Sequence, residues 1–132
     1  IESNIKISQT LTLGGSFKID AAEESGGQGL GVRPKALMLT SLAGCSGMDI
    51  VSLLKKMRAE VTNIEINVTG ELTEEHPKIY NKVHVEYLFY GSDFQKDKIE
   101  KAVALSAEKY CGVMEMFRQF AEVSSEIKYI KK

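Results

Sequence analysis

The sequence predicts a single α+β domain over residues 1–132, in which an antiparallel sheet packs on a long, buried central helix. Residues 36–48 carry no charge and place apolar or small side chains on all sides of a helical wheel. Residues 63–72 and 80–90 alternate apolar and polar side chains, as strands with one covered face do. The expected order is β-β-α-β-β-α-α-β, which is not the regular alternation of a parallel α/β protein.

The N-terminal part predicts a strand pair followed by a loop. Alternation from Ile5 to Leu13 predicts a strand, Gly14-Gly15 a hairpin turn, and residues 16–20 the returning strand. Residues 21–32 contain the run G-G-Q-G-L-G, which lacks the G-x-G-x-x-G spacing of a dinucleotide site. We therefore expect a mobile loop here rather than a nucleotide site.

The central helix is predicted from Pro34 to about Ala59, because proline suits the first helical turn. Near its middle, Cys45 is bracketed by Gly44 and Gly47, and each glycine weakens a helix by roughly 1 kcal/mol relative to alanine. The glycines also permit a close approach to the backbone. One sheet face cannot cover a helix that is apolar all round, so we expect a homodimer that pairs the central helices.

The C-terminal half predicts two further helices and a last strand. Ser92 and Gln95 have the spacing of a capping box at the start of a helix that runs to about Tyr110. A short helix over residues 113–120 and a strand over residues 123–130 follow. The side chains expected on the inner side of the first of these helices are Ile99, Val103, Ser106 or Ala107, and Tyr110.

Composition excludes several classes of protein. With 43% hydrophobic and 27% charged residues and a net charge of -1, the chain is typical of a soluble globular domain and offers no basic patch for nucleic acid. A membrane span over residues 36–54 is disfavoured by Asp49 and several hydroxyl and glycine residues. The first ten residues lack the pattern of a secretory signal, so we expect a cytoplasmic protein.

The two cysteines, Cys45 and Cys111, are 66 positions apart and form no C-x-x-C unit. Each could simply fill space in the core, as buried cysteines often do. However, the expected start of the short helix at Cys111 favours a thiolate there. If the fold brings the thiols together, the pair suits a nucleophile that forms a sulfenic acid and a second thiol that resolves it to a disulfide. Asp49, one turn after Cys45, opposes this chemistry because a carboxylate raises a thiol pKa.

No resident metal is expected, because neither histidine pairs with a cysteine by spacing. His76 precedes a proline in a turn, and His84 lies on the polar face of a strand. A zinc site of two cysteines and two histidines would need all four residues to converge.

Two longer motifs carry a family resemblance. The runs P-K-A-L-M-L-T-S-L-A-G-C-S-G-M-D-I-V and A-L-S-A-E-K-Y-C-G-V resemble the cysteine motifs of the OsmC/Ohr family of thiol-dependent peroxidases, and most of all its YhfA-like branch. The resemblance spans about residues 14–130. It implies an intertwined homodimer with active sites at the subunit interface, Cys45 as the peroxidatic thiol and Cys111 as the resolving thiol. It also implies organic hydroperoxides as substrates and a dithiol reductant of lipoyl type, with no metal, haem or flavin cofactor.

The charged residues depart from those of the resembling peroxidases. Those enzymes carry a glutamate one or two positions after the helix-opening proline, where this chain has Lys35 and Ala36. They also supply an arginine from the N-terminal strands, whereas the first arginine here is Arg33. We therefore take Arg33, Lys35 and Glu108 as candidate supporting charges. The departures keep an alternative open, in which a non-enzymatic dimer of this fold binds an apolar or thiol-reactive small molecule.

Overall fold

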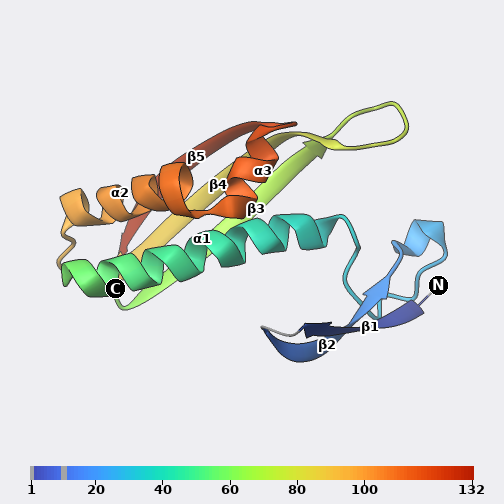
Figure 1. The fold of residues 1–132 in the computed structure, drawn as a ribbon, viewed down its shortest axis with the longest axis horizontal. Coiled ribbons are helices and arrows are strands. Elements are labelled where there is room, and N and C mark those ends of the chain that lie inside the picture. Colours follow the sequence, from blue (N-terminus) through green and yellow to red (C-terminus); the bar gives the residue numbers. More distant parts are fainter. Residues whose placement is uncertain (1, 10–11) are drawn as a thin grey trace. The chain divides into compact units, whose positions relative to one another are not determined.

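The computed structural model describes residues 2–9 and 12–132, with side chains from Lys18 onward. The elements are β1 (Glu2–Gln9), β2 (Thr12–Asp20), the 3-10 turn η1 (Glu23–Ser25), α1 (Ala36–Met57), β3 (Asn63–Leu72), β4 (Tyr80–Gly91), α2 (Lys96–Leu105), the π-helical turn η2 (Ser106–Tyr110), α3 (Gly112–Arg118) and β5 (Glu122–Lys131) (Figure 1). The predicted order of helices and strands is confirmed. The chain divides into two compact units, Ile1–Met38 and Leu39–Lys132.

The first unit holds the antiparallel pair of β1 and β2, and the predicted turn at Gly14-Gly15 is wrong. These glycines lie inside β2, and the last paired residues are Gln9 and Thr12. The predicted strand residue Leu11 lies outside the described residues. The error arises because the leucine alternation after Thr10 continues into the second strand, where a glycine pair can also be extended.

The glycine-rich loop after β2 is organised by one carboxylate. Asp20 is buried and accepts hydrogen bonds from the backbone amides of Ala21 (2.8 Å), Gln28 (2.8 Å) and Leu30 (3.1 Å). The glycines let the backbone fold back on itself, since a Cβ on Gly27 would lie 1.8 Å from the carbonyl oxygen of Ala21. The loop is therefore a hydrogen-bonded turn at the end of β2.

The second unit contains a three-stranded sheet in the order β3-β4-β5. β3 and β4 are antiparallel, with Ile64 opposite Phe89, but β4 and β5 are parallel, with Val83 opposite Val123. The predicted α+β class is confirmed, whereas the prediction of a wholly antiparallel sheet is wrong. The reason is the connection: α2, η2 and α3 carry the chain back along the sheet before β5 begins, and such a crossover is what joins parallel strands.

The hydrophobic core lies between this sheet and the three helices, which cover one of its faces (Figure 1). The strands contribute alternate residues, and the helices contribute one stripe each. The fully buried members of the core are Leu42, Ile50, Val85, Tyr87, Phe89, Ile99 and Ala102. The opposite face of the sheet is polar, as predicted, and His84 there contacts Ser124 (2.7 Å) and Glu126 (3.2 Å).

Helix α1 buries one stripe within this chain, and the expectation of a helix buried all round stays a prediction, because it depends on a second copy of the chain. The buried residues Leu42, Ser46, Ile50 and Leu54 follow each other at four-residue spacing. On the opposite side, Met48 is 77% exposed and Val51 is 56% exposed. By length and composition α1 could cross a membrane, a property that core helices of soluble proteins share. Its packing against the sheet in the second unit makes it a core helix here.

The start of α2 differs from the predicted capping box. The helix begins at Lys96, and Gln95 at the N-cap position makes no side-chain capping bond. The Gln95 amide instead donates to the carbonyl of Arg58 (3.2 Å), and the Lys98 ammonium donates to the carbonyl of Met57 (2.9 Å). Two side chains of the α2 segment thus satisfy carbonyls at the end of α1, which otherwise lack partners.

Tyr110, predicted on the inner side, is 51% exposed. The π-helical turn η2 explains the difference, because its wider turn delays the inward position by one residue. The Cys111 amide donates to the Ser106 carbonyl (2.8 Å), five residues earlier, and closes this turn. Ile99, Val103 and Ser106 are buried as predicted, and Cys111 takes the next inward position.

Candidate active site

Cys45 lies on α1 at the edge of the buried stripe and is half-buried. Of the two glycines that bracket Cys45, only Gly47 has a packing reason within this chain. A Cβ on Gly47 would lie 3.3 Å from Cδ1 of Ile66, so this glycine lets β3 approach the helix closely. A Cβ on Gly44 would meet nothing within 4 Å in this chain.

Cys111 is 3% exposed and forms the N-cap of α3, as the sequence predicts. Its sulfur accepts two hydrogen bonds, from the backbone amide of Met114 (3.4 Å) and from the hydroxyl of Ser46 (3.5 Å). The Ser46 contact also ties this thiol to α1.

The fold brings the two cysteines together with a carboxylate. The Cys45 sulfur, the Cys111 sulfur and a carboxylate oxygen of Asp49 all lie within 4.8 Å of one another. Asp49 is held in place by the Ser106 hydroxyl, which donates to its Oδ2 at 3.1 Å. The structure holds both cysteines as free thiols.

The surroundings of Cys45 favour the neutral thiol over the thiolate, because they raise its pKa. Burial raises the pKa of the Cys45 thiol above its usual value, and the hydrogen bond with the Cys111 thiol raises it further. The backbone amide of Val113 lowers this pKa, while the charges of Cys111 and Asp49 raise it. The objection that the sequence raises against Asp49 is therefore confirmed by the geometry.

The wall behind the thiols contains a buried phenol. Tyr87 is fully buried on β4, and its hydroxyl has no hydrogen-bond partner in the described part of the chain. Burial raises the Tyr87 pKa, whereas the nearby Ser46 hydroxyl lowers it. Tyr87 is thus a neutral hydroxyl beside the residue that donates to Cys111.

The candidate supporting charges belong to other segments of the chain than the thiols. Arg33 and Lys35 are exposed residues of the first unit and precede α1, whereas the thiols belong to the second unit. Glu108 is exposed on η2. The carboxylate that lies beside both sulfurs is that of Asp49. A supporting role for Arg33, Lys35 or Glu108 stays a prediction.

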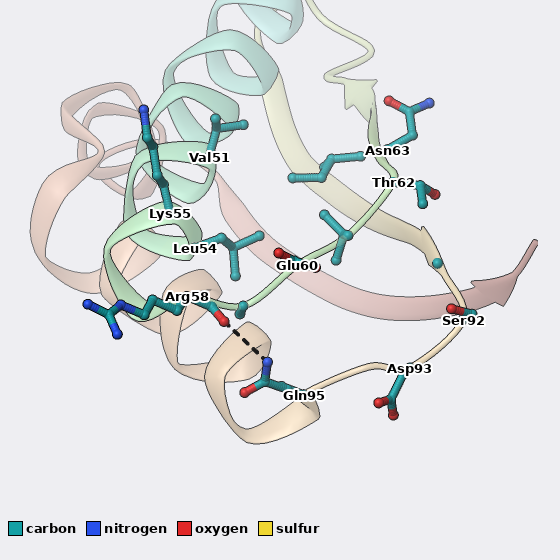
Figure 2. A pocket seen from close by; sticks show the side chains of 14 residues that line it. Val51, Leu54, Lys55, Arg58, Glu60, Thr62, Asn63, Ser92, Asp93 and Gln95 are labelled. Atoms are coloured by element: carbon teal, nitrogen blue, oxygen red, sulfur yellow. Dashed lines mark hydrogen bonds between the residues drawn. The ribbon is translucent and has the colours of Figure 1, made fainter.

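A hollow of the second unit is separate from the thiols. It has a volume of about 740 Å³ and is an open depression at the C-terminal end of α1. Figure 2 shows it between Lys55 and Arg58 on the helix side and Ser92 and Asp93 on the other, with the Gln95 bond to the Arg58 carbonyl at its floor. Neither cysteine lines it.

Sequence reasoning missed four residues of the site: Asp49 as a member of the cluster, and Ser46, Ser106 and Tyr87. A signal existed for Asp49, since residues four apart share one helix face and Cys45 and Asp49 have that spacing. Ser46 could have been found as a polar residue on the apolar stripe of α1. Ser106 was expected on the inner side of its helix and Tyr87 on the covered face of its strand, but the contact of Ser106 with Asp49 and the place of Tyr87 beside Ser46 depend on tertiary packing, which no local pattern encodes.

A family model described as OsmC-like protein matches residues 26–126. The chain belongs to the OsmC-like family. Protein YhfA of Escherichia coli K12 is a relative at 34% identity over 91 residues, which cover 69% of this chain and 68% of YhfA. The resemblance drawn from the two cysteine motifs is confirmed.

Solved structures agree with this assignment. A hypothetical protein of Aquifex aeolicus is 30% identical, with a TM-score of 0.72 and 98% of each chain covered. The organic hydroperoxide resistance protein OhrB of Bacillus subtilis is 18% identical, with a TM-score of 0.65 over 97% of this chain and 98% of OhrB. The OsmC-like fold is therefore shared with OhrB, although the sequences have diverged widely.

Proposed function

We propose that this OsmC-like protein reduces organic hydroperoxides with Cys45 and Cys111. One observation carries the proposal: two thiols that are 66 positions apart in sequence lie within 4.8 Å of each other. Membership of the family and the similar fold of OhrB, which is named for organic hydroperoxide resistance, support the choice of substrate.

In the first step, the Cys45 thiolate attacks the terminal oxygen of the hydroperoxide. The O–O bond breaks, the alkoxide leaves and takes a proton to become the alcohol, and Cys45 becomes a sulfenic acid. Cys45 is the attacking thiol because it is half-buried, whereas Cys111 is 3% exposed. The Val113 amide lowers the Cys45 pKa and so assists this step.

In the second step, the Cys111 thiolate attacks the sulfenic sulfur. Hydroxide leaves and is released as water, and a Cys45–Cys111 disulfide forms. The Met114 amide and the Ser46 hydroxyl both donate to the Cys111 sulfur and hold it in position for this step. An external dithiol, of lipoyl type, then reduces the disulfide and supplies two electrons.

The active form is a homodimer in this proposal. The exposed side of α1 carries Met48 and Val51, and Gly44 leaves open space on the same helix. Such an apolar helix face is covered when two copies pair their α1 helices. A monomeric mass in sedimentation at micromolar concentration contradicts this part of the proposal.

The test is treatment of the reduced protein with cumene hydroperoxide, followed by intact mass and a thiol count. A loss of two hydrogens per chain, mapped by peptide analysis to Cys45–Cys111, is expected. Cys45→Ser abolishes peroxide consumption in this mechanism, while Cys111→Ser permits one turnover and then accumulates sulfinic acid at Cys45. Full peroxide consumption by Cys45→Ser refutes the mechanism.

The second candidate is a non-enzymatic dimer that binds an apolar or thiol-reactive small molecule. It is favoured by the raised pKa of Cys45, which slows thiolate chemistry, and by Lys35 and Ala36 at the positions where the resembling peroxidases carry glutamate. A ligand that co-purifies with the protein, together with an unchanged mass after peroxide treatment, supports this candidate over the peroxidase.

A further inference from the structure

The cluster of Cys45, Asp49 and Cys111 has the composition of a metal site. Two thiols and a carboxylate are ligands that zinc accepts, and thiolates select zinc over the hard cations magnesium and calcium. Cys45 and Asp49 come from one face of α1, while Cys111 comes from the junction of η2 and α3. Three ligands from two separate segments can enclose an ion from two sides.

The spacing of the ligand atoms fits this ion closely. All three lie within 4.8 Å of one another. Two sulfurs bound to a tetrahedral zinc at about 2.3 Å are roughly 3.8 Å apart. The two sulfurs therefore need to approach by at most about 1 Å. The carboxylate oxygen and a sulfur, which lie roughly 3.5 Å apart around zinc, need to approach by at most about 1.3 Å, and side-chain rotations supply both movements. The fourth position of the tetrahedron remains for a water molecule.

Hydrogen bonds around the cluster hold the ligands as a metal site requires. The Ser106 hydroxyl occupies Oδ2 of Asp49 (3.1 Å) and leaves the other carboxylate oxygen for an ion. The Met114 amide and the Ser46 hydroxyl donate to the Cys111 sulfur and so fix its position. Such outer partners fix the orientation of metal ligands and tune their affinity.

The charge balance also points to a cation. Three acidic groups within 4.8 Å cannot all ionise cheaply on their own. A divalent cation at their centre removes this repulsion, because each of the three anions is then attracted to the cation.

We propose that the dithiol form of this protein binds one Zn²⁺ ion per chain through Cys45, Asp49 and Cys111, with water as the fourth ligand. Each thiol releases its proton to solvent as its sulfur–zinc bond forms. A Cys45–Cys111 disulfide removes two of the three ligands, so zinc binding and disulfide formation exclude each other. The site does not depend on peroxide turnover.

The test uses Co²⁺ as a visible probe of the reduced protein after removal of bound metals with a chelator. We expect one Co²⁺ per chain, a near-ultraviolet thiolate-to-cobalt charge-transfer band, and loss of this band when Zn²⁺ is added. Cys45→Ser and Cys111→Ser each weaken the band to half or less. Asp49→Asn weakens Co²⁺ affinity at least tenfold. Ser106→Ala, which removes an outer partner, weakens it about tenfold.

The matched control is Glu115→Gln, which removes a carboxylate at an exposed position of α3 and leaves binding unchanged. A control without substitution is wild-type protein with both thiols blocked by iodoacetamide, which must not bind. Cobalt spectra without a thiolate band, or binding that survives blocked thiols, overturn the proposal. Peroxide turnover without metal binding overturns the zinc site alone, and metal binding without turnover overturns the peroxidase alone.

Discussion

The substitution Asp49→Asn removes the carboxylate beside Cys45 while preserving its shape and its contact with Ser106. The Coulomb energy of two unit charges at 4.8 Å is about 0.9 kcal/mol in a water-like dielectric and about 3.5 kcal/mol at an effective dielectric of 20. Loss of this repulsion lowers the pKa of the Cys45 thiol, to which Asp49 contributes beside the larger effect of burial.

A lower pKa has two opposing effects on the rate at which Cys45 reacts. A fall of one unit gives about ten times more thiolate at pH 7. However, a less basic thiolate is also a weaker nucleophile, by about threefold per unit. For each unit by which the pKa falls, alkylation of Cys45 by iodoacetamide is therefore about three- to fourfold faster at pH 7. At a pH where Cys45 is fully ionised in both the variant and the wild-type protein, alkylation of the variant is about threefold slower. The two rate–pH profiles therefore cross.

The assay follows alkylation of Cys45 by peptide mass spectrometry between pH 6 and pH 11, with a chelator present to exclude metals. Glu115→Gln serves as the control, since it removes an exposed carboxylate of α3 and is expected to leave the profile unchanged. An unchanged midpoint in Asp49→Asn refutes the electrostatic argument. A slower reaction at pH 7 refutes it in another way, because Asp49 then assists the thiol as a base.

Three further predictions concern stability, measured as the free energy of unfolding in urea. Gly70→Ala lowers it by about 1–3 kcal/mol, because the new Cβ lies 2.7 Å from the buried ring of Tyr80; an unchanged value means that the ring moves freely. Tyr87→Phe leaves it unchanged or raises it by about 1 kcal/mol, because a buried hydroxyl without a partner is lost; a fall of more than about 1 kcal/mol reveals a bond to that hydroxyl. Lys98→Met lowers it by about 1 kcal/mol, because the carbonyl of Met57 loses a charged donor; equal stability means that water replaces the ammonium.

Local patterns predicted most of the fold. Strand β3 begins and ends where the alternation of residues 63–72 places it, and β4 agrees to within one residue. These strands could be predicted from alternation because one face of the sheet packs on helices and the other face is polar. The direction of β5 was not readable, because alternation specifies a strand but not which way it runs. That direction depends on the path of the three helical segments between β4 and β5.

Prediction of the site was limited by the same distinction between local and distant contacts. Both cysteines and the N-cap position of Cys111 follow from local sequence. The role of Asp49 was treated only as an obstacle to a thiolate, since its distance to Cys111 depends on how η2 packs on α1. The exposed side of α1 shows a further limit, because a pattern that is apolar all round gives no indication of which chain covers each side.

The π-helical turn before Cys111 constrains how this protein can evolve. In an α-helix, each residue rotates the chain by about 100°, so the one extra residue of the turn sets the direction in which Cys111 points. Many substitutions between Ser106 and Tyr110 would leave that direction intact, since most of these side chains face outward. Deletion of a single residue would swing Cys111 away from Cys45. Descendants of this chain can thus change the composition of the segment freely, but its length is inherited together with the thiol pair.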